Sequence, residues 1–470
     1  MPIPLIEEIK NQKIPPHILF NNIEQYPYSF LLDSAISHEK FGRYSILGCE
    51  PFLVFKSKGD SITLEWNDGR YESLKASPFL TLKSLFKRFI VKNIDGSLPF
   101  ICGGVGYFAY DMKDFIERLP DIAIDDMQVP DCVIGFYDAA LMYDNSNNKI
   151  YLASVEFPGI KTSPAKDKIL KSIFSRNFKK RKSLSSSGPI GLRSNFSKAG
   201  YINTINRAKE YIRSGDIYQV NLSQRFEAGF NTNAYDLFLR LRDSSPAPFA
   251  SYLNFKDCII ASSSPERFLM KKGDYIETRP IKGTRPRSKD AFIDSINKKE
   301  LLASQKDRAE HVMIVDLERN DLGRICEYGS VRPAEFITLE KYSTVFHLVS
   351  TVSGKLKKDI DAIDCLLAAF PGGSITGAPK IRSMEIIEEL EPVKRSIYTG
   401  AIGYISFDGN MDTSIVIRTI IVKGRKAYFQ VGGGIVADSD PESEYEETLD
   451  KAEGFMRAMG VESKEGALSG

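Results

Sequence analysis

The sequence lacks the features that would tie the chain to a membrane, a metal–sulfur site or a secretion pathway. Its six cysteines, at positions 49, 102, 132, 258, 326 and 365, show no Cys-x-x-Cys spacing, so we expect reduced, mostly buried thiols of a cytoplasmic protein. No stretch approaches the roughly 18 apolar residues of a membrane helix, and the acidic Glu7 and Glu8 stand where a signal peptide needs a basic and then an apolar segment.

The charge balance lacks a dominant sign. The 470 residues include 63 Lys and Arg against 61 Asp and Glu, a net charge of +2, which provides no general electrostatic footprint for nucleic acid or a membrane surface. Any anion-binding site must therefore be local. At this length one core is rarely sufficient, and 42% hydrophobic residues can form two domains or one large composite fold.

Local patterns predict two halves joined by a polar stretch. Residues 1–175 contain short β-type runs between Gly, Pro and Asp turns and predict a β-rich N-terminal domain. Residues 176–194 are basic and serine-rich without periodicity, and we interpret them as a linker rather than a nucleic-acid patch. Residues 195–458 alternate helix and strand patterns as a second domain, and 459–470 form a small polar tail.

The segment 279–284, Arg-Pro-Ile-Lys-Gly-Thr, sets a lysine between a proline and a glycine. Pro280 fixes φ and Gly283 permits conformations that other residues avoid, so we expect a constrained loop that presents Lys282. A presented lysine can act as a base or as a nucleophile. The same segment is also compatible with an ordinary solvent-exposed lysine.

A predicted hairpin brings a carboxyl group to this lysine. Residues 264–270 and 275–278 are strand-like and flank a turn near Gly273. In that register Glu266 faces Pro280 and lies about two residues along from the lysine, roughly 7 Å at the rise of a strand. A catalytic acid–amine pair and a simple cross-strand ion pair both fit this spacing.

Two pairs of acids are predicted to lie on helix faces. Asp307 and Glu310 have i, i+3 spacing in one predicted helix, and Glu444 and Glu447 have the same spacing in a helix that Asp440 caps. If the faces meet, the four carboxylates repel one another unless a hard cation lies between them, and oxygen ligands suit Mg²⁺. Ion pairing and helix-dipole effects explain the same spacing without a metal.

A glycine-rich stretch, 371–380, runs into an amphipathic helix. Free N–H groups at such a helix start suit an anion, and the missing Gly-Lys-Ser/Thr ending of a nucleotide-binding loop favours a compact carboxylate over a polyphosphate. A structural turn explains the stretch equally well. The side of the helix predicted to be buried is formed by Ile381, Met384, Ile387 and Leu390.

Polar side chains interrupt apolar segments further along the chain. Arg418 lies in the strand-like segment 415–422, where burial without a partner would be costly, so an internal acid or a carboxylate ligand is expected. Tyr404 and the amides of residues 432–434 could complete a fork around such a carboxylate. His347, in an apolar segment, fits a satisfied core histidine better than a catalyst.

Together these segments resemble the chorismate-utilising enzymes. The resemblance covers residues 195–458 strongly and implies an α+β fold of large antiparallel β-sheets packed as a sandwich with helices outside. The N-terminal half agrees more loosely. The segments that carry the resemblance are 264–268, 280–284, 307–324, 370–380 and 432–451, with 31–34, 42–45 and 99–111 in the N-terminal half.

Two positions place the resemblance within the family. Anthranilate-forming members carry alanine where this chain has Lys282, and isochorismate- and salicylate-forming members carry a water-activating lysine where it has Gln219. The combination is similar to the branch that aminates chorismate at C4 with ammonia, giving 4-amino-4-deoxychorismate for 4-aminobenzoate and folate synthesis.

The resemblance implies a covalent mechanism. Lys282 adds to C2 of chorismate while Glu266 protonates the departing 4-hydroxyl, and ammonia then attacks C4 and expels the lysine. His347 is expected near the substrate ring. The residues expected to hold the two carboxylates of chorismate are Thr376, Gly377, Ala378, Tyr404, Arg418, Gly432, Gly433, Gly434 and Lys451.

The resemblance also implies a cofactor and partners. Mg²⁺ is expected to bind Glu310 and Glu447 directly, and Asp307 and Glu444 through water. The sequence has no Gly-x-Cys-x-Gly nucleophile elbow of a glutamine amidotransferase. The resemblance implies that a separate amidotransferase subunit supplies ammonia in a heterodimer.

Residues 31–34 and 43–45 resemble the segments that hold tryptophan in relatives. Ser34 and Tyr44 therefore mark a possible tryptophan site, although Asp33 replaces the more usual glutamate.

Two other functions stay open. The first is amination at C2 with release of pyruvate, against which Lys282 argues. The second is a non-catalytic chorismate-binding regulatory module, which would be expected to have lost some of Glu266, Glu310, Glu447 or Lys282, and all four are present.

Overall fold

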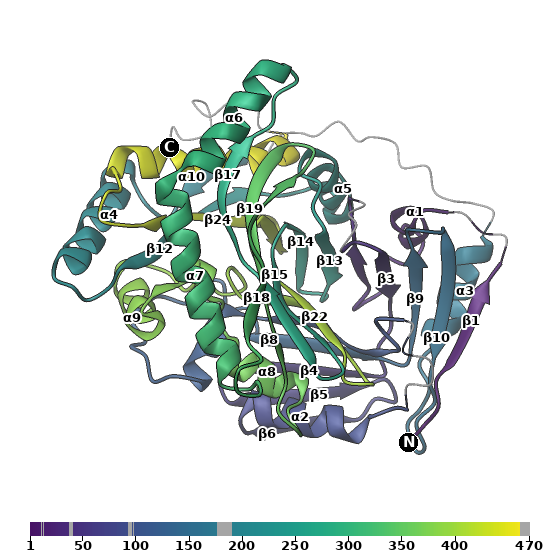
Figure 1. The fold of residues 1–470 in the computed structure, drawn as a ribbon. Coiled ribbons are helices and arrows are strands. Elements are labelled where there is room, and N and C mark those ends of the chain that lie inside the picture. The colour runs from purple at the N-terminus through teal and green to yellow at the C-terminus, as the bar shows by residue number, and fades with distance from the viewer. Residues whose placement is uncertain are drawn as a thin grey trace.

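Two antiparallel sheets form the frame of the protein (Figure 1). The computed structural model describes residues 1–10, 12, 14–36, 41–92, 96, 98–175 and 190–460, and each sheet has 12 strands. In these ranges the helices are α1 (Pro16–Phe20), α2 (Pro78–Arg88), α3 (Ala165–Phe174), α4 (Lys198–Arg213), α5 (Ala234–Ser244), α6 (Ala291–Ala303), α7 (Gln305–Gly323), α8 (Ala362–Ala369), α9 (Lys380–Leu390) and α10 (Pro441–Met459), with 3-10 turns η1 (Tyr110–Phe115) and η2 (Gly373–Ile375).

The first sheet joins the N-terminal strands to the last strands of the chain. Its spatial order is β1 (Leu5–Ile9), β10 (Lys149–Ser154), β9 (Ala139–Asp144), β3 (Tyr44–Gly48), β2 (Phe30–Asp33), β13 (Phe249–Asn254), β14 (Cys258–Ser264), β23 (Thr419–Lys423), β24 (Lys426–Ile435), β12 (Gln219–Gly229) and β11 (Ile190–Ser194), and β20 (Gly377–Ala378) also pairs with β12.

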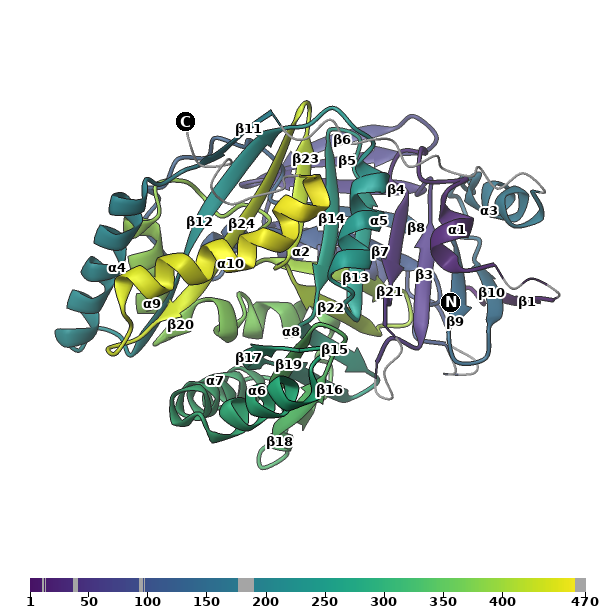
Figure 2. The same cartoon turned by 90° about the horizontal axis from the view of Figure 1, so that it is seen from above.

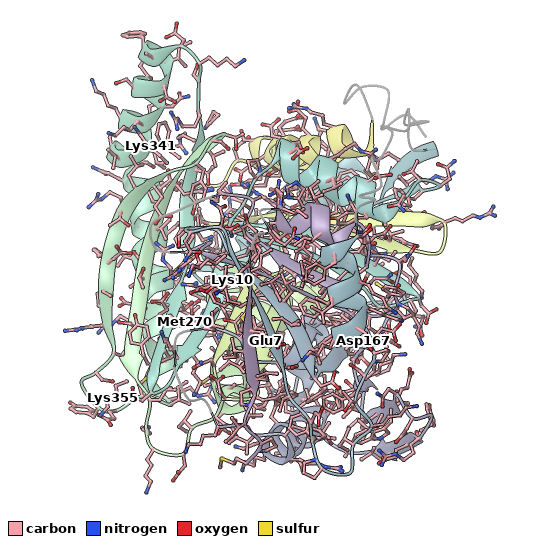
Figure 3. All side chains as sticks on the ribbon, turned by 90° about the vertical axis from the view of Figure 1, so that its right-hand side faces the viewer. Glu7, Lys10, Asp167, Met270, Lys341 and Lys355 are labelled. Carbon is pink, nitrogen blue, oxygen red and sulfur yellow. The ribbon has the colours of Figure 1, made fainter. Side chains whose placement is uncertain are left out.

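The second sheet carries the predicted hairpin. Its spatial order is β17 (Ile281–Pro286), β19 (Val345–Lys355), β16 (Tyr275–Arg279), β15 (Arg267–Lys272), β22 (Met411–Ile415), β21 (Ala401–Ser406), β7 (Gly103–Phe108), β8 (Cys132–Tyr137), β4 (Leu53–Lys58), β5 (Ser61–Trp66) and β6 (Tyr71–Lys75), and β18 (Arg332–Lys341) pairs with β19. In Figure 3, Lys341 and Lys355 mark opposite ends of the β18–β19 pair.

Two apolar layers hold these elements together. One fills the space between the sheets, where Phe55 and Phe136 of the second sheet join a cluster with Phe30 and Ile260 of the first. The other lies between the first sheet and the helices that cover it, where α10 crosses β24 and packs beside α5 (Figure 2). The expected sandwich of antiparallel sheets with helices outside is therefore confirmed.

Both sheets mix strands from the two halves of the chain. β2 pairs with β13 in the first sheet, and β7 pairs with β21 in the second. The predicted limits at 175 and 195 thus divide the chain in sequence, while backbone hydrogen bonds join the two segments edge to edge.

The predicted linker and tail are only partly structured as expected. Residues 176–189 lie outside the described residues, but 190–194 form the edge strand β11 rather than a linker, because β12 supplies hydrogen-bond partners that side-chain periodicity does not signal. Of the predicted tail, Met459 closes α10 and Gly460 caps it with φ +86°, and 461–470 lie outside the described residues. Within the described ranges, no helix is long and apolar enough to cross a membrane.

Candidate functional site

Lys282 lies in a distorted strand rather than in the loop that the sequence predicted. β17 begins directly after Pro280, and its pairing with β19 shifts register between Ile281 and Thr284. Gly283, inside this bulge, has φ +81°, a conformation that favours glycine. The bulge therefore presents the half-buried lysine outside the regular alternation of the strand.

The amine of Lys282 reaches the facing edge of the first sheet. A methyl group added at Gly434 on β24 would lie 3.3 Å from Lys282 Nζ and 2.0 Å from Gln219 Nε2. A side chain at 434 would fit only if the end of the Gln219 side chain moved, so glycine lets Gln219 keep its present position. Lys282 and Gln219, the two residues that distinguish branches of the family, thus lie close together between the sheets.

Glu266 faces this lysine from the start of the hairpin. Arg267 pairs with Arg279, which puts Glu266 opposite Pro280 as predicted, although the pairing shifts by one residue between Arg267 and Met270. The carboxyl is 5% exposed and accepts a 2.6 Å hydrogen bond from Ser374 Oγ. Burial raises the pKa of Glu266 to about 7, against the lowering effects of Ser374 and Lys282.

The electrostatic surroundings of Lys282 favour its neutral form. Burial lowers the pKa of this amine, and the charge of Lys451 lowers it further, although Glu310, Glu266 and Glu447 oppose the shift. An unperturbed lysine near pKa 10.4 is almost fully protonated at pH 7, so a lowered pKa increases the fraction that can act as a nucleophile.

Acids of both predicted helix faces act on the lysine, Glu310 from α7 and Glu447 from α10. Burial raises the pKa values of Glu310 and Glu444, and Glu310 is destabilised further by the charges of Asp307 and Glu444. Burial also acts on Glu447, but Lys451, 2.7 Å away, lowers the pKa of that carboxyl below its usual value. The mutual repulsion shows that α7 and α10 bring their acids to one site.

These carboxylates are balanced by cations in the structure. Arg285 Nη2 lies 3.2 Å from Asp307 Oδ2, and Lys306 Nζ lies 3.9 Å from Glu444 Oε1. Within the described ranges, no group of three or more His, Cys, Asp or Glu is arranged to hold a metal ion. The oxygen-only donors and their mutual repulsion nevertheless fit a hard divalent cation in chemical character.

The glycine-rich stretch closes the site from the side of β12. Gly377 and Ala378 form β20, and the backbone N–H of Asn221 donates to Thr376 O. The following helix buries Met384, Ile387 and Leu390 as predicted. The prediction for Ile381 is wrong, since this residue is 46% exposed; burial in a first turn depends on neighbouring elements that periodicity does not show.

Arg418 does not lie within a strand. β22 ends at Ile415 and β23 begins at Thr419, because the chain crosses there from the second sheet to the first, and Arg418 sits in the bend with φ +49°. Its guanidinium makes a long bond of 3.5 Å to Ser245 Oγ and, among the described residues, no ion pair. Burial lowers its pKa, although Tyr342 opposes the shift.

His347 has a hydrogen-bond partner for only one of its two ring nitrogens among the described residues. Its ring is 2% exposed, and Nδ1 lies 2.8 Å from Thr284 Oγ1. The other nitrogen, Nε2, is buried without a hydrogen-bond partner among the described residues. Burial and the charge of Arg418 lower the pKa of His347 to about 3, so a neutral imidazole stands beside the guanidinium.

Sequence and structure comparisons agree on the family. The family model described as "chorismate binding enzyme" matches residues 34–457. The chain belongs to the family of chorismate-binding enzymes. It is 39% identical over 469 residues to anthranilate synthase component 1 of Acetivibrio thermocellus, with 97% of this chain and 95% of the relative covered.

Members with two different names are equally similar to this chorismate-binding enzyme. Aminodeoxychorismate synthase component 1 of Bacillus subtilis is also 39% identical, over 444 residues, which are 93% of this chain and 92% of the relative. The crystal structure of anthranilate synthase component I from Streptococcus pneumoniae superimposes with a TM-score of 0.79 at 32% identity, covering 90% of this chain and 94% of that chain.

Tyr404 is the predicted site residue that the structure places elsewhere. It packs edge-on against Phe100, with ring centroids 5.1 Å apart, and lines a second cavity of about 700 Å³. Met270 of β15, labelled in Figure 3, and Tyr44 of β3 line the same cavity. The sequence of a strand does not show what packs against each of its faces. Residue spacing alone therefore could not show that Tyr404 lies in this cavity rather than beside Lys282.

The second cavity is lined by two residues of each predicted tryptophan segment, Leu32 and Asp33 from the first and Arg43 and Tyr44 from the second. Asp33 lines it, and Arg242 Nε and Ser45 Oγ donate to this carboxylate at 2.6 and 2.8 Å. Tyr44 lines it as well, whereas Ser34 is buried and donates to Ile36 O at 2.6 Å.

Sequence reasoning missed three polar residues that support the enzyme's site. Ser374 bonds to Glu266, and Tyr342 stacks edge-on against His347 with centroids 5.2 Å apart. His311 of α7 is fully buried, with Nε2 2.6 Å from Ser350 Oγ. Only Ser374 carried a signal, because it lies in the glycine-rich stretch.

Proposed function

We propose that this enzyme aminates chorismate at C4 with ammonia and releases 4-amino-4-deoxychorismate, the reaction of an aminodeoxychorismate synthase component I. The observation that carries the proposal is the amine of Lys282, with a lowered pKa, beside the carboxyl of Glu266. Relatives that form anthranilate are expected to carry alanine at this position and so lack the nucleophile.

The two side chains are matched to complementary steps. With a pKa near 7, Glu266 retains a proton at neutral pH that it can give to the departing 4-hydroxyl, which leaves as water. The neutral amine of Lys282 forms a bond to C2 as the ring double bond shifts and the C4–O bond breaks. Ammonia then bonds to C4, the double bond returns, and the C2–N bond to Lys282 breaks.

The charged groups around this pair suit the two carboxylates of chorismate. Arg418, which has no ion-pair partner among the described residues, is proposed to bind the enolpyruvyl carboxylate together with Lys451 and the amides of residues 432–434. His347 Nε2, which has no hydrogen-bond partner among the described residues, is proposed to contact the substrate ring. The amides of Thr376, Gly377 and Ala378 are proposed to bind the ring carboxylate.

Mg²⁺ is proposed as the cofactor. Glu310 and Glu447 would bind it directly, and Asp307 and Glu444 through water. When bound, the cation supplies the positive charge that neutralises the ring carboxylate of the substrate beside four acids.

Two partners complete the proposal. A glutamine amidotransferase subunit supplies ammonia, and tryptophan occupies the second cavity. The paired charges of that cavity support a ligand without net charge, because Arg267 is bonded to Glu277 and Asp412, at 2.6 and 2.9 Å. The aromatic rings of Tyr44 and Phe249 line it as well.

The test is a product assay. The purified enzyme is incubated with chorismate, Mg²⁺ and ammonium at pH 8, and the products are separated by chromatography. We expect 4-amino-4-deoxychorismate without pyruvate. Anthranilate with an equal amount of pyruvate would overturn the proposal in favour of anthranilate synthase, a function supported by the equal identity of the Acetivibrio relative.

A further inference from the structure

Glu318 is a buried acid that the mechanism above does not use. It lies on α7, two turns beyond Glu310, and is 2% exposed. One of its oxygens, Oε1, accepts the backbone N–H of Gly373 at 3.1 Å. The other, Oε2, is buried without a hydrogen-bond partner among the described residues. Burying a carboxyl oxygen without a hydrogen-bond partner costs free energy, so a structural or functional role for Glu318 is expected.

The turn that Glu318 holds is the one that carries Ser374. η2 (Gly373–Ile375) is seated directly on α7: a methyl group added at Gly373 would lie 2.5 Å from Leu317 Cδ2 and 3.2 Å from Glu318 Oε1. The next residue, Ser374, donates from Oγ to Glu266 Oε1 at 2.6 Å. One continuous path of contacts therefore runs from α7 to the general acid.

We propose that Glu318 is a positioning residue for Glu266: by accepting the Gly373 amide it fixes η2, so that the Ser374 hydroxyl stays on the carboxyl that gives up the proton. This inference rests on the proposed role of Glu266 as general acid. It assigns to Glu318 no contact with the substrate.

The charged groups around Glu318 and Glu266 affect the protonation of both carboxyl groups. Glu318 faces Asp321 on its own helix, Lys380 of α9 and Glu266, and burial together with the charge of Asp321 raises the pKa of Glu318 to about 8. Glu266 faces Lys282 of β17 in addition to Ser374. The raised pKa favours the neutral form of Glu318, and its effect on Glu266 passes through the hydrogen bonds to Gly373 and from Ser374.

The experiment compares four single variants, and the double variant that combines Ser374→Ala with Glu318→Leu, by the pH profile of kcat/KM for chorismate consumption. Ser374→Ala removes the hydrogen bond to Glu266 directly. Glu318→Leu removes it through the turn, and Glu318→Gln keeps an acceptor for Gly373. Asp316→Asn, on the exposed face of the same helix, is the control.

We expect Ser374→Ala and Glu318→Leu to lower kcat about tenfold and to move the alkaline limb of the profile upward by about one pH unit, because the lost bond favoured the ionised form of Glu266. The double variant should be no slower than Ser374→Ala alone. Glu318→Gln should restore both the rate and the limb, and Asp316→Asn should match the parent.

Two results would overturn the inference. One is an unshifted limb in Glu318→Leu, or effects of Ser374→Ala and Glu318→Leu that multiply in the double variant. The other, which is decisive even if Glu318→Leu fails to fold, is a shift in Glu318→Gln as large as that in Ser374→Ala. Chorismate consumption is followed whichever aminated product forms, so product identity tests the proposed function separately.

Discussion

The second cavity and the Lys282 site differ in how their charges are neutralised. In the cavity Arg267 and Arg279 are bonded to acids, Arg279 to Glu340 at 2.6 Å. At the Lys282 site Arg418 has one long bond to a hydroxyl, and burial lowers the pKa values of Arg418 and Lys282. Paired charges stabilise the fold, whereas unpaired ones are available to a charged ligand, and perturbed pKa values gather where chemistry is expected.

Removing the lysine amine should have the largest effect. We expect Lys282→Ala to lower formation of the C4-aminated product by about a thousandfold or more while chorismate still binds, because the nucleophile is lost and the carboxylate contacts remain. Chromatography gives the product and calorimetry the binding. Lys341→Ala, at an exposed end of β18, is the control; full activity of Lys282→Ala would exclude the covalent role.

Replacing the general acid should separate activity from stability. Glu266→Gln should be about a hundredfold slower. Because the folded pKa of Glu266, about 7, exceeds its usual 4.5, folded protein retains the proton that unfolded chain loses, and the wild type loses stability from about pH 4.5 to 7.

Glu266→Gln lacks this titration, so its unfolding free energy should rise relative to the wild type by up to about 3 kcal/mol between pH 5 and 8. Urea unfolding at the two pH values measures the difference. A constant difference would mean that Glu266 titrates normally in the folded protein.

The two arginines should respond in opposite ways. Arg267→Met leaves the buried Glu277 and the partly buried Asp412 without their partner and should destabilise the protein by about 3–5 kcal/mol. Arg418→Met should unfold no more easily than the wild type but raise KM for chorismate about tenfold or more. Thermal unfolding and steady-state kinetics on both variants test the contrast, which fails if both lose stability equally.

The smallest expected effect is ligand binding in the second cavity. Tryptophan at about 100 times its Kd should raise Tm by about 1–3 °C through preferential binding to the folded state. Tyr44→Ala should lose this shift and Lys282→Ala should keep it. An unchanged Tm in the wild type would remove the tryptophan site, and an equal shift in Tyr44→Ala would move it elsewhere.

Local features were predictable where local physics determines them. Asp440 caps α10 as expected, since its side chain accepts the N–H of Ser443. The turn near Gly273 forms as predicted, but the strand pairing shifts by one residue between Arg267 and Met270, and this bulge brings Glu266 opposite Pro280. The prediction that Arg418 lies inside a strand failed because the residues around it are mostly apolar over 415–422, although the chain passes from one sheet to the other there. Tyr404 was assigned to the wrong cavity for a similar reason, because strand alternation does not show what packs on each face.

The sequence by itself determined the family and the residue on which the proposed reaction depends, because the identity of the side chain at position 282 does not depend on the fold. Only the tertiary structure decided which groups perturb that lysine: Glu310, Lys451 and Glu266, which Ser374 holds from a turn over 100 residues away. Desolvation and charge coupling depend on distances between segments far apart in the chain, and no local pattern contains those distances.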